Sequence, residues 1–141
     1  MSRADVVDAA RAWLGTPYRH RAATLGAGCD CLGLLRGVWR SVIGDEPEAL
    51  PNYASDWRRV EGDALESACA RWLVRAEGDA QEGQVVLFRI GRDGRARHCG
   101  IMVKPMRFIH AQERIGVVEA NMGESWARRI AGLYEFPGVH D

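Results

Sequence analysis

The stretch Gly28-Cys29-Asp30-Cys31-Leu32-Gly33-Leu34 decides how this chain folds, because it leads into a segment of apolar periodicity. Apolar side chains recur at helical spacing from residue 31 to residue 43, and Gly44 follows as a stop signal. The pattern predicts a helix that begins at Cys31. A sulfur at a helix start faces unpaired backbone N–H groups and the positive end of the helix dipole, which favour thiolate over thiol. Cys31 is therefore a candidate nucleophile.

Two histidines far downstream, His98 and His110, stand in segments of β-strand character. A thiol with an unperturbed pKa is only slightly ionised at neutral pH, so a nucleophile benefits from an imidazole partner. We expect His98 to be that partner for Cys31. A ring nitrogen of His110, on the next strand, would accept from the other N–H of His98 and fix its tautomer. The three residues together predict a cysteine hydrolase.

Strand alternation gives a more detailed expectation for the segment that begins near His98. Side chains of a strand point alternately to its two faces. If His98 faces the helix, Gly100 and Met102 share its face, whereas Cys99 and Ile101 face the other way. This reasoning makes His98, and not Cys99, the functional partner of the nucleophile.

The order of the predicted elements favours an α+β domain, with N-terminal helices packed on an antiparallel β-sheet of about five or six strands. A first helix is capped by Ser2 and ended by Gly15-Thr16-Pro17. A further helical region is expected over about 56 to 74, with an interruption at Gly62-Asp63. A helical turn is expected over 125–130. The expected strands are 85–88, 100–103, 108–110, 115–118 and 133–136.

Length and charge limit the functional classes. The 141 residues fit one domain spanning 1–141, without repeats or an interdomain linker. Basic and acidic residues both number 19, so no global field attracts nucleic acid, and we expect no nucleic-acid partner. No uninterrupted apolar segment has the length of a signal peptide or membrane span, so we expect synthesis in the bacterial cytoplasm and no membrane insertion.

The four cysteines are too few and too irregularly spaced for a disulfide framework, and we expect reduced thiols. Cys29, Cys31, His98 and Cys99 are the residues from which a zinc site could be built. Structural zinc sites favour Cys-x₂₋₄-Cys spacing, which neither pair supplies. We therefore expect no metal and no cofactor. Cys69 and most of the five tryptophans are expected to pack in the core, and Trp57 is the candidate for a residue that lines a groove.

The motifs, taken in order, resemble the NlpC/P60 peptidases of the papain-like fold. The resemblance covers nearly the whole chain. It rests on Gly15-Thr16-Pro17-Tyr18, on Asp30-Cys31-Leu32-Gly33-Leu34, on the strand 85–88 after Glu82-Gly83, on His98-Cys99-Gly100-Ile101 and on Phe108-Ile109-His110-Ala111.

The resemblance implies the roles of five residues. Cys31 would be the nucleophile, His98 the general base and acid, and His110 the residue that orients His98. Tyr18 would bring its hydroxyl near the oxyanion, and Asp30 is the further candidate for substrate binding. The implied substrate is a peptidoglycan stem peptide, with the γ-D-glutamyl-diaminopimelate bond as the usual choice.

The sequence departs from the family pattern at three places. Leu32 stands where many members carry a serine that helps to recognise a free amino terminus. The segment Arg19-His20-Arg21-Ala22 replaces a common Gly-Gly, so the rim of the groove is expected to differ, and His20 is a candidate rim residue. Gln84 stands at a position where aspartate is common.

Within the family, the chain looks most similar to compact peptidases of phage tails and gene transfer agents. This resemblance also rests on Trp126-Ala127-Arg128-Arg129 and on residues 133–137. The implied partners are tail tip or hub proteins, and the implied place of action is the periplasmic cell wall, reached as part of a particle. Two alternatives stay open. One is a structural tail module with a weak or inactive site, and the other is a papain-like amidase or acyltransferase.

Overall fold

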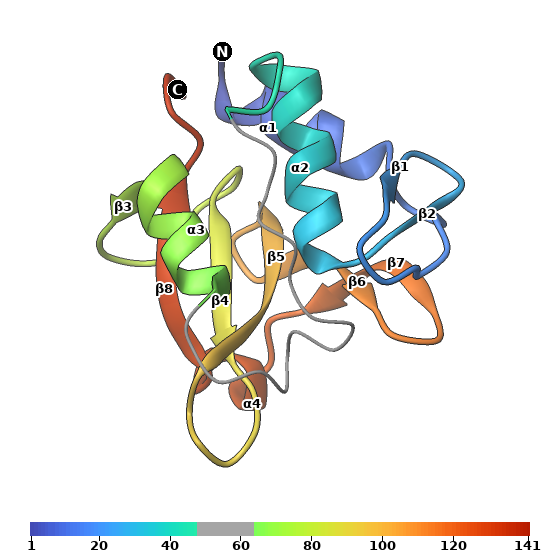
Figure 1. Cartoon of the computed structure of the whole chain (residues 1–141). Coiled ribbons are helices and arrows are strands. Elements are labelled where there is room, and N and C mark those ends of the chain that lie inside the picture. Colours follow the sequence, from blue (N-terminus) through green and yellow to red (C-terminus); the bar gives the residue numbers. More distant parts are fainter. Residues whose placement is uncertain (48–63) are drawn as a thin grey trace.

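The computed structural model describes residues 1–47 and 64–141, and the account of the fold is confined to them. Helices come first and most strands follow, as Figure 1 shows. The helices are α1 (Arg3–Arg11), α2 (Cys31–Val42), α3 (Ala64–Trp72) and α4 (Glu124–Ala127). The strands are β1 (Ala23–Thr24), β2 (Gly28–Cys29), β3 (Val74–Ala76), β4 (Val85–Arg89), β5 (Ala96–Lys104), β6 (Arg107–Gln112), β7 (Gly116–Asn121) and β8 (Ile130–Glu135).

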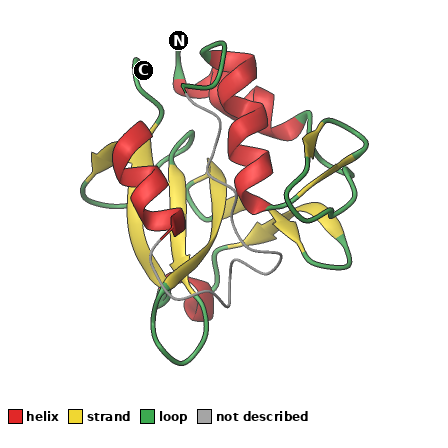
Figure 2. Cartoon of the chain, in the orientation of Figure 1, coloured by secondary structure: helices red, strands yellow, loops and turns green. Residues whose placement is uncertain are grey.

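The main sheet has six strands in the order β3-β8-β4-β5-β6-β7, and all of its pairings are antiparallel. Side chains of α1, α2 and α3 share a common apolar core with one face of this sheet. Figure 2 shows the helices in red beside the yellow strands. The short α4 contributes Trp126 to a second cluster, on the opposite face. The predicted α+β fold, with N-terminal helices on an antiparallel sheet of five or six strands, is confirmed.

The first helix begins as its sequence predicts. The Ser2 hydroxyl accepts from the Asp5 backbone N–H, and the Asp5 carboxylate accepts from the Ser2 N–H, which completes a capping box. The helix ends at Arg11, and Trp13 is buried just beyond it. A Cβ atom on Gly37 of α2 would lie 1.9 Å from the Trp13 ring, so this glycine lets the indole pack directly against the helix backbone.

Two neighbouring strands at one side of the sheet, β3 and β8, differ from the sequence-based expectation. Val74, at the end of the expected helical region, instead begins the edge strand β3, because residues 74–76 pair with Leu133–Glu135 of β8. Pairing with β4 likewise lets β8 begin at Ile130, before the expected strand start at 133. The earlier part of the expected 56–74 helical region, including the Gly62-Asp63 break and Trp57, lies outside the described residues.

The orientation expected for the side chains of β5 is wrong. Cys99 and Ile101 face the helices and pack in the same core as Cys31, whereas Met102 lies in the cluster on the opposite face. The physical reason is burial, because Cys99, Ile101 and Val103 supply the apolar layer that α2 needs. His98 alternates with Cys99 and packs against Phe88, which belongs to the second cluster.

Candidate active site

Cys31 is the first residue of α2, and the residue before it caps the helix. The Asp30 Oδ1 atom accepts from the Gly33 N–H at 2.7 Å, and its Oδ2 atom accepts from the Arg21 N–H at 2.8 Å. Asp30 is completely buried. Its carboxylate thus holds the helix start and the preceding loop in one arrangement around the sulfur. This geometry favours a capping role, and the expected contact of Asp30 with substrate stays a prediction.

The loop that precedes the helix lies unusually close to α2 at Gly33. A Cβ atom on Gly33 would stand 1.8 Å from the Ala22 carbonyl oxygen, so only glycine permits this approach. Ala22 also receives a hydrogen bond at its carbonyl from the Asp30 N–H, at 3.3 Å. The Asp-Cys-x-Gly order therefore has a local reason: the acid caps the helix, and the glycine admits the loop beside the nucleophile.

The two histidines of the sequence prediction meet on neighbouring strands. His98 of β5 and His110 of β6 approach with 2.8 Å between Nε2 of His98 and Nδ1 of His110. The rings are nearly perpendicular, with an angle of 83° between their planes. His110 is buried, so its ring is held in place by the core around it. The pair has the geometry in which one imidazole orients the other.

Aromatic rings cover this pair on the face away from the helices. The indole of Trp126 has its centroid 5.8 Å from that of His98 and 5.4 Å from that of His110. The ring centroids of Phe88 and Trp126 lie 4.7 Å apart, and the guanidinium carbon of Arg129 lies 5.8 Å from the indole centroid. Trp126 was assigned to packing from the sequence, and nothing in the spacing indicated that its α4 helix would bring it to the two histidines.

The surroundings of Cys31 favour its charged form. A hydrogen bond from the Cys99 thiol is the main influence that lowers the pKa of Cys31, to about 6, from an ordinary value of 9.0. Burial opposes this shift, while a hydrogen bond to His98 and the charge of His98 support it. A thiolate next to an imidazolium is the form in which a cysteine attacks carbonyl carbon.

Burial has the opposite effect on the other site groups. It raises the pKa of Cys99 well above 9.0, with Cys31 adding to the shift, so Cys99 keeps its proton. Burial, together with the charge of His98, lowers the pKa of His110 to about 4. A neutral His110 has one ring nitrogen free of a proton, and that nitrogen can accept from a positively charged His98.

Cys99 is the site residue that the sequence-based reasoning set aside. Its Sγ atom lies 3.4 Å from the Cys31 carbonyl oxygen, and both residues are buried. Two adjacent residues of β5 reach the nucleophile, and not His98 alone, since both His98 and Cys99 form hydrogen bonds with Cys31. A signal was available in the sequence, since Cys99, Ile101 and Val103 form the apolar half of the strand.

The remaining candidate residues lie around the helix start. The backbone of Tyr18 bridges that of Cys29, and the Tyr18 side chain packs against the core that contains Cys31. Its place at an oxyanion stays a prediction. The His20 Nδ1 atom lies 3.8 Å from Asp30 Oδ2, so His20 belongs to the loop over the helix start. Cys69 is a core residue of α3.

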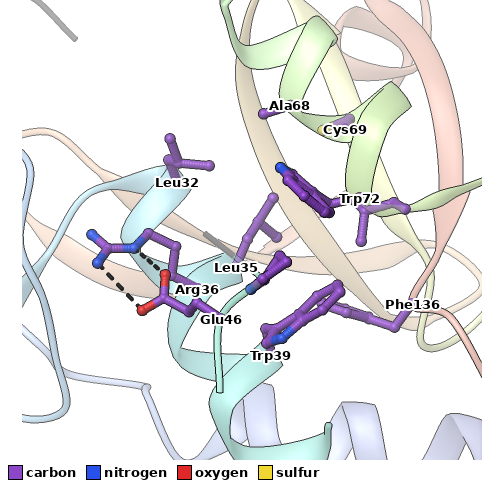
Figure 3. A pocket seen from close by; sticks show the side chains of 11 residues that line it. Leu32, Leu35, Arg36, Trp39, Glu46, Ala68, Cys69, Trp72 and Phe136 are labelled. Carbon is purple, nitrogen blue, oxygen red and sulfur yellow. Dashed lines mark hydrogen bonds and ion pairs between the residues drawn. The ribbon is translucent and has the colours of Figure 1, made fainter. Parts of the chain in front are cut away.

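An apolar pocket opens beside the residue that follows the nucleophile. Leu32 lies at one side of it, and the rings of Trp39 and Trp72 face it from α2 and α3, as Figure 3 shows. The guanidinium of Arg36 is paired with the Glu46 carboxylate at 2.6 Å on the polar side. The other lining residues are Leu35, Pro47, Ala68, Cys69, Leu73 and Phe136.

Residues 1–47 and 64–141 contain neither a metal-binding cluster nor a membrane-spanning helix. No three His, Cys, Asp or Glu side chains there are grouped so as to hold a metal ion. Nor does any helix in this part of the chain combine the length and apolar character needed to cross a bilayer.

A cysteine at a helix N-terminus, next to two histidines on an antiparallel sheet, defines the class of papain-like thiol hydrolases. The chain belongs to the NlpC/P60 family, whose model matches residues 15–134. It is 30% identical, over 128 residues and 90% of its length, to the murein DD-endopeptidase MepS/murein LD-carboxypeptidase of Escherichia coli strain K12. It is also 30% identical, over 81% of its length, to a probable endopeptidase of Haemophilus influenzae. The matched parts are 59% and 62% of these two relatives.

Solved structures show the same fold. The NlpC/p60 domain of the peptidoglycan hydrolase SagA superposes with a TM-score of 0.66 at 22% identity, covering 96% of this chain and 100% of that domain. An NlpC/P60 family protein from Bacillus cereus gives a TM-score of 0.67 at 17% identity, covering 96% of this chain and 40% of the other. At these identities the likeness concerns the fold.

Proposed function

We propose that this chain is a cysteine peptidase that hydrolyses the stem peptides of peptidoglycan. The observation that carries the proposal is the arrangement of Cys31 at the start of α2, with its pKa lowered, beside the hydrogen-bonded pair His98 and His110. The substrate class is supported by the relative named a murein DD-endopeptidase and by the peptidoglycan hydrolase whose domain shares the fold.

The proposed reaction begins with attack of the Cys31 thiolate on an amide carbonyl carbon, which moves the carbonyl electron pair onto oxygen. The Cys31 backbone N–H, in the first turn of α2, and the Tyr18 hydroxyl stabilise that oxyanion. His98 donates its proton to the leaving amine, and the C–N bond breaks to leave a thioester. Water then attacks the thioester while His98 takes its proton, and the carboxylic acid leaves as the thiolate is restored.

The bond cleaved in the stem peptide is proposed to be γ-D-glutamyl-diaminopimelate. The support is the resemblance of the Asp30-Cys31 and His98 motifs to the family pattern. The relative from Escherichia coli is named for a DD-endopeptidase activity, so a D-amino-acid crosslink is the competing bond. Defined muropeptides carrying both bonds, with fragments identified by mass, distinguish the two.

The proposed activity is tested by incubating purified sacculi with the protein and measuring the peptides released. Wild type should release peptides and Cys31→Ala should release none. His140→Ala, which alters an exposed residue near the C-terminus, is the matched control and should act as wild type. Equal release by Cys31→Ala would overturn the assignment.

We further propose that the activity is carried by a phage-like tail or gene transfer agent particle, which would bring the enzyme to the periplasmic cell wall. The support is the similarity of residues 126–129 and 133–137 to tail-associated peptidases. Co-purification of the chain with tail tip or hub proteins would support this setting. If the protein digests sacculi but does not associate with a particle, the tail setting is contradicted and the peptidase activity stands.

If the folded protein does not act on sacculi, the structural tail module is favoured. If it turns over lipid or protein amides, the amidase or acyltransferase is favoured.

A further inference from the structure

Strand β5 contacts helix α2 at the nucleophile, through Cys99 and Cys31. Cys99 of β5 pairs with Leu87 of β4 in the centre of the sheet, and its side chain faces the helices. There its Sγ atom lies 3.4 Å from the carbonyl oxygen of Cys31. Sulfur hydrogen bonds are longer than those of nitrogen or oxygen, and this distance is within their range.

The environments of the two cysteines determine which one donates the hydrogen bond and which one accepts it. Cys99 is fully buried, which raises the pKa of its thiol well above 9.0, so it carries a proton to donate. Cys31 faces the N–H groups of the helix start and the charge of His98, which favour the loss of its proton. The Cys99 thiol therefore has two acceptors on one residue, namely the carbonyl oxygen and, once Cys31 ionises, its charged sulfur.

We propose that Cys99 is a positioning residue for the nucleophile, whose thiol donates a hydrogen bond to Cys31 and holds the sulfur as a thiolate facing His98. Two consecutive residues of β5 then have different roles. His98 transfers the proton, and Cys99 anchors the first turn of α2 to the sheet. The inference rests on the proposed role of Cys31 as nucleophile and deepens it.

The test measures the rate at which iodoacetamide alkylates Cys31 between pH 4.5 and 9.5, with the modified peptide identified by mass. Cys99→Val keeps the approximate volume but removes the donor, Cys99→Ala removes both, and Cys99→Ser restores a donor. Cys29→Ala is the matched control, because it removes a second buried thiol two residues from Cys31. Thermal denaturation of each variant reports whether it is folded.

The Cys99 thiol is expected to stabilise the Cys31 thiolate as much as a hydrogen bond to a charged group usually does. Cys99→Val and Cys99→Ala should move the midpoint upward by about one pH unit, and from a pKa of about 6 this lowers the alkylation rate at pH 6 about fivefold. Cys99→Ser should return the midpoint to near that of wild type, and Cys29→Ala should leave it unchanged. A serine variant shifted as far as valine, an equal shift in Cys29→Ala, or an unmoved midpoint in folded Cys99→Val would each overturn the proposal.

This readout needs no substrate, so it is separate from the proposed peptidase activity. Protein that shows the expected shifts but releases nothing from sacculi would contradict the peptidoglycan assignment and leave the role of Cys99 intact. Protein that digests sacculi but shows no shift in the Cys99 variants would do the reverse.

Discussion

The Nε2 atom of His98 lies 2.8 Å from the Nδ1 atom of His110, and this single contact assigns different tasks to the two histidines. Of the two histidines, only His98 also forms a hydrogen bond with Cys31, so it is the one that can transfer the proton. His98→Ala should lower kcat/KM by at least about 100-fold. His110→Ala should lower it less, because the variant loses orientation and keeps the proton carrier.

The distinction is measured by steady-state kinetics on a defined muropeptide. His110→Asn offers a side-chain oxygen that can still accept from His98, so it should recover part of the activity lost in His110→Ala. Equal losses in His98→Ala and His110→Ala would contradict the assignment of roles.

His110 is expected to stay neutral throughout the range in which the site works. Burial and the charge of His98 lower its pKa to about 4, below the ordinary 6.5. The lowered value means that this histidine stabilises the fold fully above about pH 6.5, and that the contribution is lost as the pH falls through about 4. Ring ¹⁵N shifts followed by NMR should show no protonation of His110 above pH 5. A titration midpoint near 6.5 would contradict the buried pair.

The core thiol Cys69 predicts a loss of stability in alkaline solution. Burial raises its pKa from 9.0 to about 12, so its contribution is complete below pH 9 and is lost as the pH rises through 12. The free energy of unfolding should fall by up to about 1.4 kcal/mol per pH unit for this group. Cys31 adds no slope in that window, because it is ionised in both states.

Urea denaturation between pH 8 and pH 10.5 measures this dependence. Cys69→Ala has lower stability at pH 8 because it leaves a small cavity, but its slope above pH 9 should be shallower by one proton. A variant with the same slope as wild type would show that Cys69 ionises freely in the folded protein.

The sequence predicted most of the helices and strands because each has a local cause. Ser2 and Asp30 cap the two first helices, and the short β-prone runs between turn residues became the strands of the sheet. The edge strand β3 was missed because it is made by pairing with β8, a partner about 60 residues away in the chain. No periodicity in three residues can indicate such a pairing.

The site was predictable in its residue types and less so in its contacts. The order of Cys31, His98 and His110 indicated the three side chains that the fold brings together. The contact of Cys99 with Cys31 was missed, although the apolar alternation of Cys99, Ile101 and Val103 indicates which face of β5 packs against α2. The position of Trp126 depends on how the short α4 helix folds back over the histidines.

Trp126 is expected to matter for the orientation of the histidine pair. The centroid of its indole lies 5.8 Å from that of the His98 ring and 5.4 Å from that of the His110 ring. Trp126→Ala should lower kcat/KM by about 10- to 100-fold, because the His98 ring gains freedom to turn. Trp126→Phe keeps an aromatic cover and should lose less. Unchanged kcat/KM in Trp126→Ala would show that the surrounding core alone fixes the rings.

Gly33 is the position at which a single methyl group should disrupt the site. An alanine Cβ there would lie 1.8 Å from the Ala22 carbonyl oxygen, and the obstacle is backbone, which cannot turn aside as a side chain can. Gly33→Ala should therefore lower the free energy of unfolding by about 3 kcal/mol, although alanine is the better helix former. Ala22→Gly should not rescue it, since the carbonyl remains. Gly123→Ala is the control, because a Cβ on Gly123 meets nothing within 4 Å, and it should cost less than about 1 kcal/mol. Urea denaturation checks both, and a Gly33→Ala variant as stable as Gly123→Ala would contradict the close approach of the loop to the nucleophile helix.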